Sequence, residues 1–192
     1  MVFQIPAGNA FPLDKSGRPD FLAALERQKG YFQSGATLAP ARRIEALKAP
    51  YGSERAETDI FEALEADLGK GEFESYMCEV GLTLSEIFYL VKHTKKFARD
   101  RRVKTPLSQF AAKSFVRRSP YGTVLVMSPW NYPFLLTMEP LADALAAGNT
   151  AILKPSAYSP NVSRVIQGYR AHLSADTSPS PRAGARERQT AG

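Results

Sequence analysis

The side chains best suited to chemistry follow two short apolar runs in the second half of the chain. Residues 122–127 are apolar and β-branched, and the polar, proline-bounded stretch 128–133 comes directly after them. Asn131 lies in that stretch, and its side-chain amide can donate hydrogen bonds. Open α/β sheets bind ligands at the carboxyl ends of their strands, which is where this amide is expected. From the residues alone, a turn role for Asn131 ahead of Tyr132 and Pro133 is the simpler interpretation.

A second polar group follows the next apolar run. Residues 150–153 form a short apolar stretch that is closed by Lys154, Pro155 and Ser156. An ammonium at a strand end can bind a ribose hydroxyl or a phosphate oxygen. Taken by itself, Lys154 is more simply interpreted as an ordinary solvated lysine at a strand exit. Ser156 is a weaker candidate for a contact.

The other reactive side chains form no pattern. Cys78, the single cysteine, lies on the apolar side of a predicted helix, so we interpret it as a packing residue. His93 and His172 are too few and too widely separated for a metal site, and no metal is expected. One cysteine excludes an internal disulfide framework. With no recognisable signal peptide and no apolar run long enough to span a membrane, the expected location is the cytoplasm.

The segments that position Asn131 and Lys154 are predicted to form a strand, a helix and a second strand. The apolar run 122–127 suits a buried parallel strand, and residues 134–147 are predicted to be a helix that ends at Gly148 and Asn149. Residues 150–153 then give the second strand. These elements form a βαβ unit, which predicts a parallel sheet with helices packed on it.

The first hundred residues carry helical periodicity. Residues 20–34 and 57–68 read as amphipathic helices, and 74–102 shows the strongest periodic signal, with cations at its end that suit a helix C-terminus. Residues 108–118 look extended. The predicted fold class is therefore α/β: a helical N-terminal part followed by the first βαβ unit of a Rossmann-like parallel sheet.

The net charge of +6 does not indicate a nucleic-acid-binding protein. Residues 164–192 contain five arginines and two acidic residues, so this segment carries half of the net positive charge. The rest of the chain is nearly balanced, and its basic cluster near residue 100 lacks interleaved aromatic residues. A nucleic-acid partner is therefore not expected.

Several short motifs together resemble the aldehyde dehydrogenase superfamily. The stretch 128–134 and the run from Ala147 to Ser156 resemble the opening βαβ unit of its dinucleotide-binding domain. Three flanking segments narrow the resemblance to the class 3-like branch: Tyr31–Thr37, Ala66–Lys70 and Val103–Leu107. Each fragment alone is weakly specific, but they occur in order at natural spacing. The resemblance runs from about residue 20 to residue 167.

The resemblance implies roles for the candidate residues. In this family a thiolate attacks an aldehyde, and Asn131 matches the amide that stabilises the resulting oxyanion; losing such a donor typically costs ~10²–10³ in rate. Pro129 and Trp130 are expected to line the cofactor or substrate channel. Lys154 matches the lysine that binds the adenosine ribose of NAD or NADP, with Ser156 beside it. Ala157 stands where many relatives have a glutamate, so either cofactor remains possible.

The resemblance also implies that this chain corresponds to an N-terminal fragment. Members of the family continue through a catalytic cysteine that matches nothing here, so the chain alone is expected not to oxidise aldehydes. The predicted domains are residues 1–168, a partial dinucleotide-binding domain, and a tail at 169–192. The segment 107–119 matches an extended oligomerisation segment, which implies a homodimer in the full-length form, with an aldehyde as substrate. The alternative is a nucleotide-binding or subunit-pairing module without catalysis.

The tail has the composition of a disordered segment. Most of residues 169–192 lack apolar periodicity and are rich in turn formers. Residues 169–174 can be written in codons whose shifted frame encodes a credible continuation of an amphipathic helix, so a frameshift is one hypothesis; a short isoform and a degraded gene are the others. We also expect strand 150–153 to expose one edge of the sheet.

Overall fold

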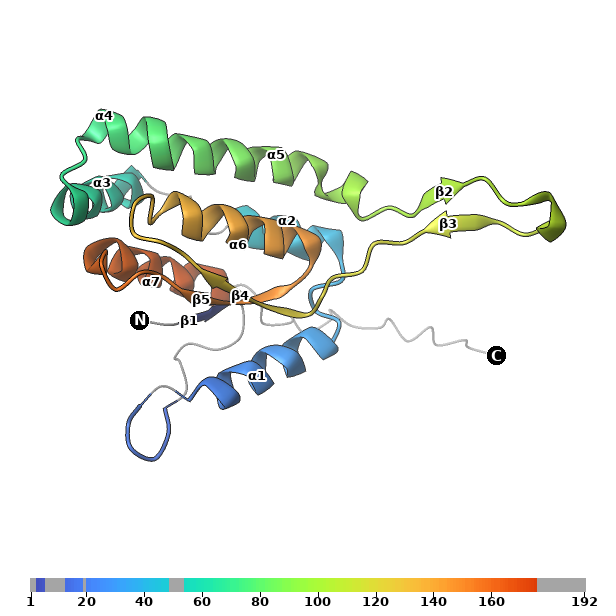
Figure 1. Ribbon diagram of the computed structural model, residues 1–192, viewed down its shortest axis with the longest axis horizontal. Coiled ribbons are helices and arrows are strands. Elements are labelled where there is room, and N and C mark those ends of the chain that lie inside the picture. The colour runs from blue at the N-terminus through green and yellow to red at the C-terminus, as the bar shows by residue number, and fades with distance from the viewer. Residues whose placement is uncertain (1–2, 6–12, 19, 49–53, 176–192) are drawn as a thin grey trace, which may run out of the picture.

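The main sheet has three strands and contains the predicted βαβ unit (Figure 1). The computed structural model describes residues 3–5, 13–18, 20–48 and 54–175. Strand β4 (Thr123–Met127) is parallel to β5 (Thr150–Lys154), and helix α6 (Leu135–Ala147) connects them. Their carboxyl ends coincide, because Met127 is the register partner of Lys154. The predicted fold class is confirmed.

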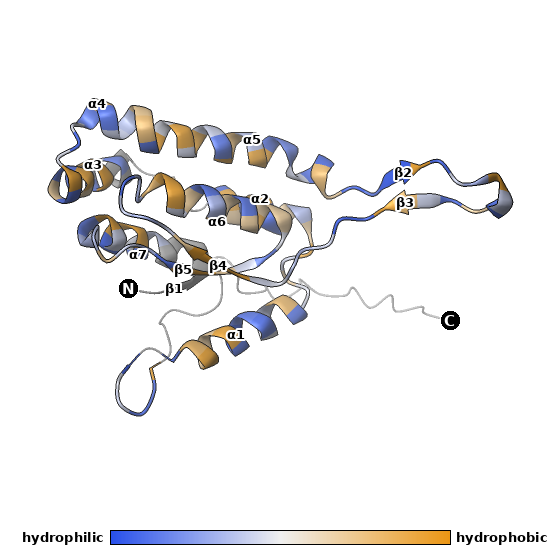
Figure 2. Cartoon of the chain, in the orientation of Figure 1, coloured by the Kyte–Doolittle hydropathy of each residue, from blue (hydrophilic) through white to orange (hydrophobic). Residues whose placement is uncertain are grey.

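The edge strands of this sheet are β1 (Phe3–Ile5) and β4, so the prediction that strand 150–153 would expose an edge is wrong. The short strand β1 pairs antiparallel with β5 and places it in the centre of the sheet. So short an N-terminal segment carries no local pattern that predicts a strand. Leu125 and Met127 of β4 are 60% and 67% exposed, and Figure 2 shows β4 coloured as hydrophobic.

Helices lie on both sides of the sheet. Figure 1 shows α5 and α6 on one side and α1 on the other, and both α1 and α6 contact β4 and β5. Helix α3 packs along α7. The bounds are α1 (Phe21–Gln33), α2 (Pro40–Lys48), α3 (Glu54–Leu68), α4 (Glu72–Ser75), the π-helical turn η2 (Tyr76–Val80), α5 (Gly81–Phe97) and α7 (Pro160–Ala175).

The helix predicted over 74–102 is divided and ends early. It consists of α4, η2 and α5, and α5 stops at Phe97. Lys95 and Lys96 do lie in the last turn, where cations favour the helix dipole. The following basic residues instead form β2 (Arg101–Val103), because pairing with β3 (Ser114–Val116) overrides the local helical pattern.

Strands β2 and β3 form an antiparallel hairpin that projects from the body of the molecule (Figure 1). Its tip carries a 3₁₀ turn, η3 (Leu107–Gln109). The prediction that 108–118 is extended is therefore confirmed only for the β3 part. Leu107 and Phe110 at the tip are 91% and 89% exposed.

The last described helix continues beyond the predicted domain boundary at residue 168. Helix α7 runs to Ala175, so the expectation of a disordered tail beginning at residue 169 is wrong at its start. Alanine, leucine and arginine in this stretch favour a helix, and Tyr169 is buried with its ring 6.4 Å from that of Phe134. Residues 176–192 lie outside the described part of the chain.

The core lies where α6 and α7 meet the sheet and the helices at 40–97. Its largest fully buried apolar side chains are Phe134, Leu47, Leu64, Met138, Leu141, Leu153 and Ile166. Across the described residues, no helix is long and apolar enough to cross a membrane. The cytoplasmic location stays a prediction.

Candidate functional site

The predicted site residues meet at the carboxyl edge of the two parallel strands. Pro129, Trp130 and Asn131 are exposed on the loop between β4 and α6. Lys154 is exposed at the end of β5, and its carbonyl accepts a hydrogen bond from the backbone N–H of Ser128 at 3.3 Å. The fold thus brings both motifs to one edge, with Ser156 half-buried just beyond Lys154.

The two polar groups singled out for chemistry have side chains without internal partners. Within the described residues, neither the Asn131 amide nor the Lys154 ammonium makes a hydrogen bond or ion pair to another side chain or to backbone. Both remain available to a ligand. An amide donor and an ammonium suit an oxyanion and a hydroxyl or phosphate oxygen respectively.

Buried hydroxyl groups fix the two ends of the Asn131 loop. The hydroxyls of Ser128 and Thr137 lie 2.6 Å apart, and Thr137 Oγ1 donates to the carbonyl oxygen of Pro133 at 2.6 Å. Both side chains are buried. Because buried polar groups must be paired, these bonds hold the loop against the first turn of α6.

A buried ion pair between Lys70 and Glu79 also contacts this loop. Lys70 Nζ donates to a carboxylate oxygen of Glu79 and to the carbonyl oxygen of Asn131, the latter at 2.9 Å. Sequence reasoning missed both residues as functional candidates. Lys70 belongs to the quoted Ala66–Lys70 segment, and the signal for Glu79 is a carboxylate among the apolar residues of an amphipathic helix.

Asn149 locks the other end of the βαβ unit. Its Oδ1 accepts from the backbone N–H of Gly122 at 3.0 Å, and its Nδ2 donates to the carbonyl oxygen of Ala144 at 3.2 Å. The preceding Gly148 ends α6 in the left-handed region, with φ of 91°. A Cβ at Gly148 would lie 2.6 Å from the Arg43 guanidinium carbon, the end of a flexible side chain, so the positive φ is what favours glycine here.

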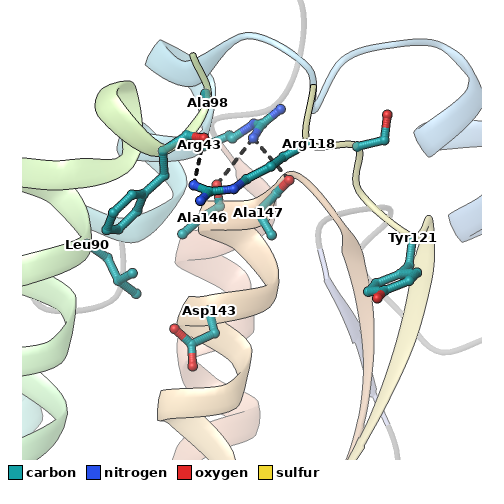
Figure 3. A pocket seen from close by; sticks show the side chains of 10 residues that line it. Arg43, Leu90, Ala98, Arg118, Tyr121, Asp143, Ala146 and Ala147 are labelled. Carbon is teal, nitrogen blue, oxygen red and sulfur yellow. Dashed lines mark hydrogen bonds between the residues drawn. The ribbon is translucent and has the colours of Figure 1, made fainter. Parts of the chain in front are cut away.

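A cavity of about 580 Å³ opens at the C-terminal end of α6 (Figure 3). Arg43 fills one side of it and donates to the carbonyl oxygens of Ala146 and Ala147 at 3.3 and 3.0 Å. Burial raises the pKa of the Asp143 carboxyl, which also lines the cavity and precedes these two alanines in α6. The cavity contains none of the predicted site residues, and Arg43 is occupied as a C-terminal cap of α6.

The comparison with known families fits this arrangement. Residues 12–171 match the model of the aldehyde dehydrogenase family. The chain belongs to the aldehyde dehydrogenase family. Its similarity to class 3 members, predicted from the short flanking segments, is confirmed: it is 36% identical over 157 residues to aldehyde dehydrogenase family 3 member B3 of Mus musculus, covering 81% of this chain and 33% of that protein.

A bacterial relative is more similar in sequence. The chain is 46% identical over 140 residues to the 4,4'-diaponeurosporen-aldehyde dehydrogenase of Staphylococcus aureus, covering 72% of this chain and 30% of that enzyme. It thus spans about a third of the length of these aldehyde dehydrogenases.

Solved structures show the same fold. The substrate-bound state of Staphylococcus aureus AldH superposes with a TM-score of 0.73 at 43% identity, covering 78% of this chain and 33% of that one. A succinic semialdehyde dehydrogenase from Streptococcus pyogenes, solved with NADP+, gives a TM-score of 0.69 at 19% identity, covering 85% and 35%. The second likeness concerns the fold alone.

Proposed function

We propose that this aldehyde dehydrogenase segment supplies the oxyanion donor and part of the cofactor site for NAD(P)-dependent oxidation of an aldehyde to a carboxylic acid. The observation that carries the proposal is the exposed amide of Asn131, which has no partner among the described residues. It lies at the carboxyl edge of β4 and β5, on a loop held by hydrogen bonds from Lys70 and between Ser128 and Thr137. An amide on a loop whose backbone is held in this way can donate to a developing oxyanion without moving the backbone during the reaction.

The cofactor contacts in this proposal come from both strand ends. The ammonium of Lys154 suits an adenosine ribose hydroxyl, with Ser156 close by, and Pro129 and Trp130 offer apolar surface beside Asn131. The cofactor, when bound, supplies the hydride acceptor. Ala157 leaves NAD and NADP both open, and a relative at 38% identity is the dimeric NADP-preferring enzyme of Canis lupus familiaris.

The 192 residues alone are expected to show no turnover, because the nucleophilic thiolate has no counterpart among them. Cys78 is the single cysteine and is half-buried in η2. Purified chain is mixed with an aliphatic or aromatic aldehyde and NAD or NADP, and the reduced cofactor is followed by absorbance. Clear turnover would contradict the proposed division of roles.

Cofactor binding is tested separately by calorimetry with NAD and NADP. Weak heat that Lys154→Met abolishes and Lys92→Met leaves unchanged would support the cofactor site. Lys92 is an exposed lysine on α5, a helix that packs on α6 and α2. Absence of heat with either cofactor contradicts this part of the proposal.

A second candidate function, subunit pairing, is favoured by the projecting hairpin. Leu107, Phe110 and Phe115 are exposed on it, and exposed apolar clusters mark association surfaces. We propose that the hairpin pairs with a second aldehyde dehydrogenase subunit, as in a homodimer. Replacing Leu107 and Phe110 with aspartate should convert a dimer to a monomer in sedimentation velocity, whereas Leu22→Asp on α1 should not. A monomeric parent chain speaks against pairing through this fragment.

A further inference from the structure

A buried ion pair holds the backbone that follows the Asn131 side chain. Lys70 is 8% exposed and Glu79 is fully buried. Lys70 Nζ donates to the Asn131 carbonyl oxygen, and the second carboxylate oxygen of Glu79 accepts from the backbone N–H groups of Phe134 and Leu135 at 2.8 and 3.2 Å. The pair therefore ties Asn131 to the start of α6.

Glu79 serves as the N-terminal cap of α6 although it belongs to another helix. The first N–H groups of a helix need acceptors, and a carboxylate is a favourable one. Phe134, the residue at the cap position, has no side-chain oxygen that could accept them. Lys70 also lies over the Tyr132 ring, 4.1 Å from its centre, so its ammonium contacts two consecutive residues of the loop.

The π-helical turn η2 carries Glu79. Gly81 N donates to the Tyr76 carbonyl oxygen, and a Cβ at Gly81 would lie 2.9 Å from that oxygen. Isolated π-turns are uncommon and are frequent at functional sites. Glycine at position 81 permits the turn from which Glu79 reaches α6.

Stability alone does not account for such a pair. Burying two charges costs much of what their attraction gains, and well-packed apolar residues often stabilise a core as well or better. The pair instead fixes backbone geometry. The Lys70 ammonium binds one carbonyl oxygen, and the Glu79 carboxylate binds two backbone N–H groups.

We propose that Lys70 and Glu79 are positioning residues for Asn131. They hold its backbone and the following turn, and they leave its side-chain amide free at the carboxyl edge. This inference rests on the proposed oxyanion role of Asn131, for which displacement of a group by about 1 Å can cost ~10² in rate.

The single tryptophan, Trp130, reports on this loop without any need for turnover. It precedes Asn131 and is 55% exposed, so its local motion appears as the fast part of its fluorescence anisotropy decay. The variants are Lys70→Met, Glu79→Gln and the double variant. Asp100→Asn, which breaks the exposed ion pair with Arg117 on the hairpin, is the control. Melting and far-ultraviolet circular dichroism report the fold of each.

In the double variant, the stability should recover while the Asn131 loop remains mobile. Lys70→Met leaves an unpaired buried carboxylate, so its melting temperature falls and the fast amplitude of Trp130 rises about two-fold. The double variant removes the charge and keeps an acceptor for α6, so its melting temperature recovers. Its Trp130 stays mobile because the Asn131 carbonyl still lacks its donor. The control changes neither quantity.

The proposal is overturned if Trp130 in the double variant is as ordered as in the parent chain, or if Trp130 is already fully mobile in the parent. Should Lys70→Met fail to fold, the double variant and the parent still decide the question. Cofactor binding and turnover do not enter this measurement, so failure of the proposed function and failure of the positioning role give different results.

Discussion

At the scale of single residues, two asparagines of one βαβ unit do opposite things. Asn149 is 4% exposed and bonded to backbone at both ends of its amide. Asn131 is exposed, and its amide has no partner among the described residues. The same chemical group therefore holds the fold at one position and is available to a ligand at the other.

Replacing Asn149 with leucine should destabilise the chain by about 1–3 kcal/mol, because the buried N–H of Gly122 loses its acceptor. Urea denaturation of the purified chain measures this. Asn131→Ala is the matched control and should change the free energy of unfolding by less than about 0.5 kcal/mol, as expected for an exposed site. Equal effects of the two variants would contradict the assignment of Asn149 as the structural member.

At the scale of elements, helices are fixed by side chains that reach them from other helices. Glu79 caps α6 from η2, Arg43 caps the other end of α6 from α2, and Asp67 caps α7 from the end of α3. None of these contacts is a local capping pattern. They set how the helices are placed around the strand ends, and so where the Asn131 loop lies.

Asp67→Ala should lower the free energy of unfolding by about 0.5–2 kcal/mol, the range for a lost N-terminal cap. The Asp67 carboxylate accepts from the backbone N–H groups of Asn161 and Val162 and from the Asn161 side chain, at 3.2, 2.9 and 2.7 Å. Hydrogen exchange at the Asn161 and Val162 amides should accelerate. Glu65→Ala, an exposed acidic residue on the same helix, is the control; a similar loss there would point to helix α3 itself rather than to the cap of α7.

At the scale of the whole molecule, the sheet has an open side at β4. Its edge is unpaired among the described strands, and Leu125 and Met127 are exposed on it. An exposed apolar edge strand is a site of association. The chain covers about a third of the length of the aldehyde dehydrogenases that it matches.

The purified 192-residue chain should therefore bind a hydrophobic dye and associate non-specifically. Replacing Leu125 and Met127 with threonine should reduce dye fluorescence by about half, because these two residues form the apolar surface of the edge. Leu22→Thr, an exposed leucine on α1, should have little effect. A monodisperse monomer with a sharp melt and no dye binding would show instead that the chain is an autonomous domain.

The sequence by itself determined the local elements and their order around the site. Apolar runs, turn residues and the Gly148–Asn149 pair predicted β4, α6 and β5, because these patterns depend on neighbouring residues. They also placed Asn131 and Lys154 after parallel strands, whose carboxyl ends must coincide. Tertiary structure decided the rest. Three features depend on contacts between different segments of the chain. They are the end of α5, where β2 pairs with β3, the pairing of β1 with β5, and the contact of the Lys70–Glu79 pair with Asn131. Their energies come from hydrogen bonds and burial that exist only after the chain has folded, so no local sequence pattern predicts them.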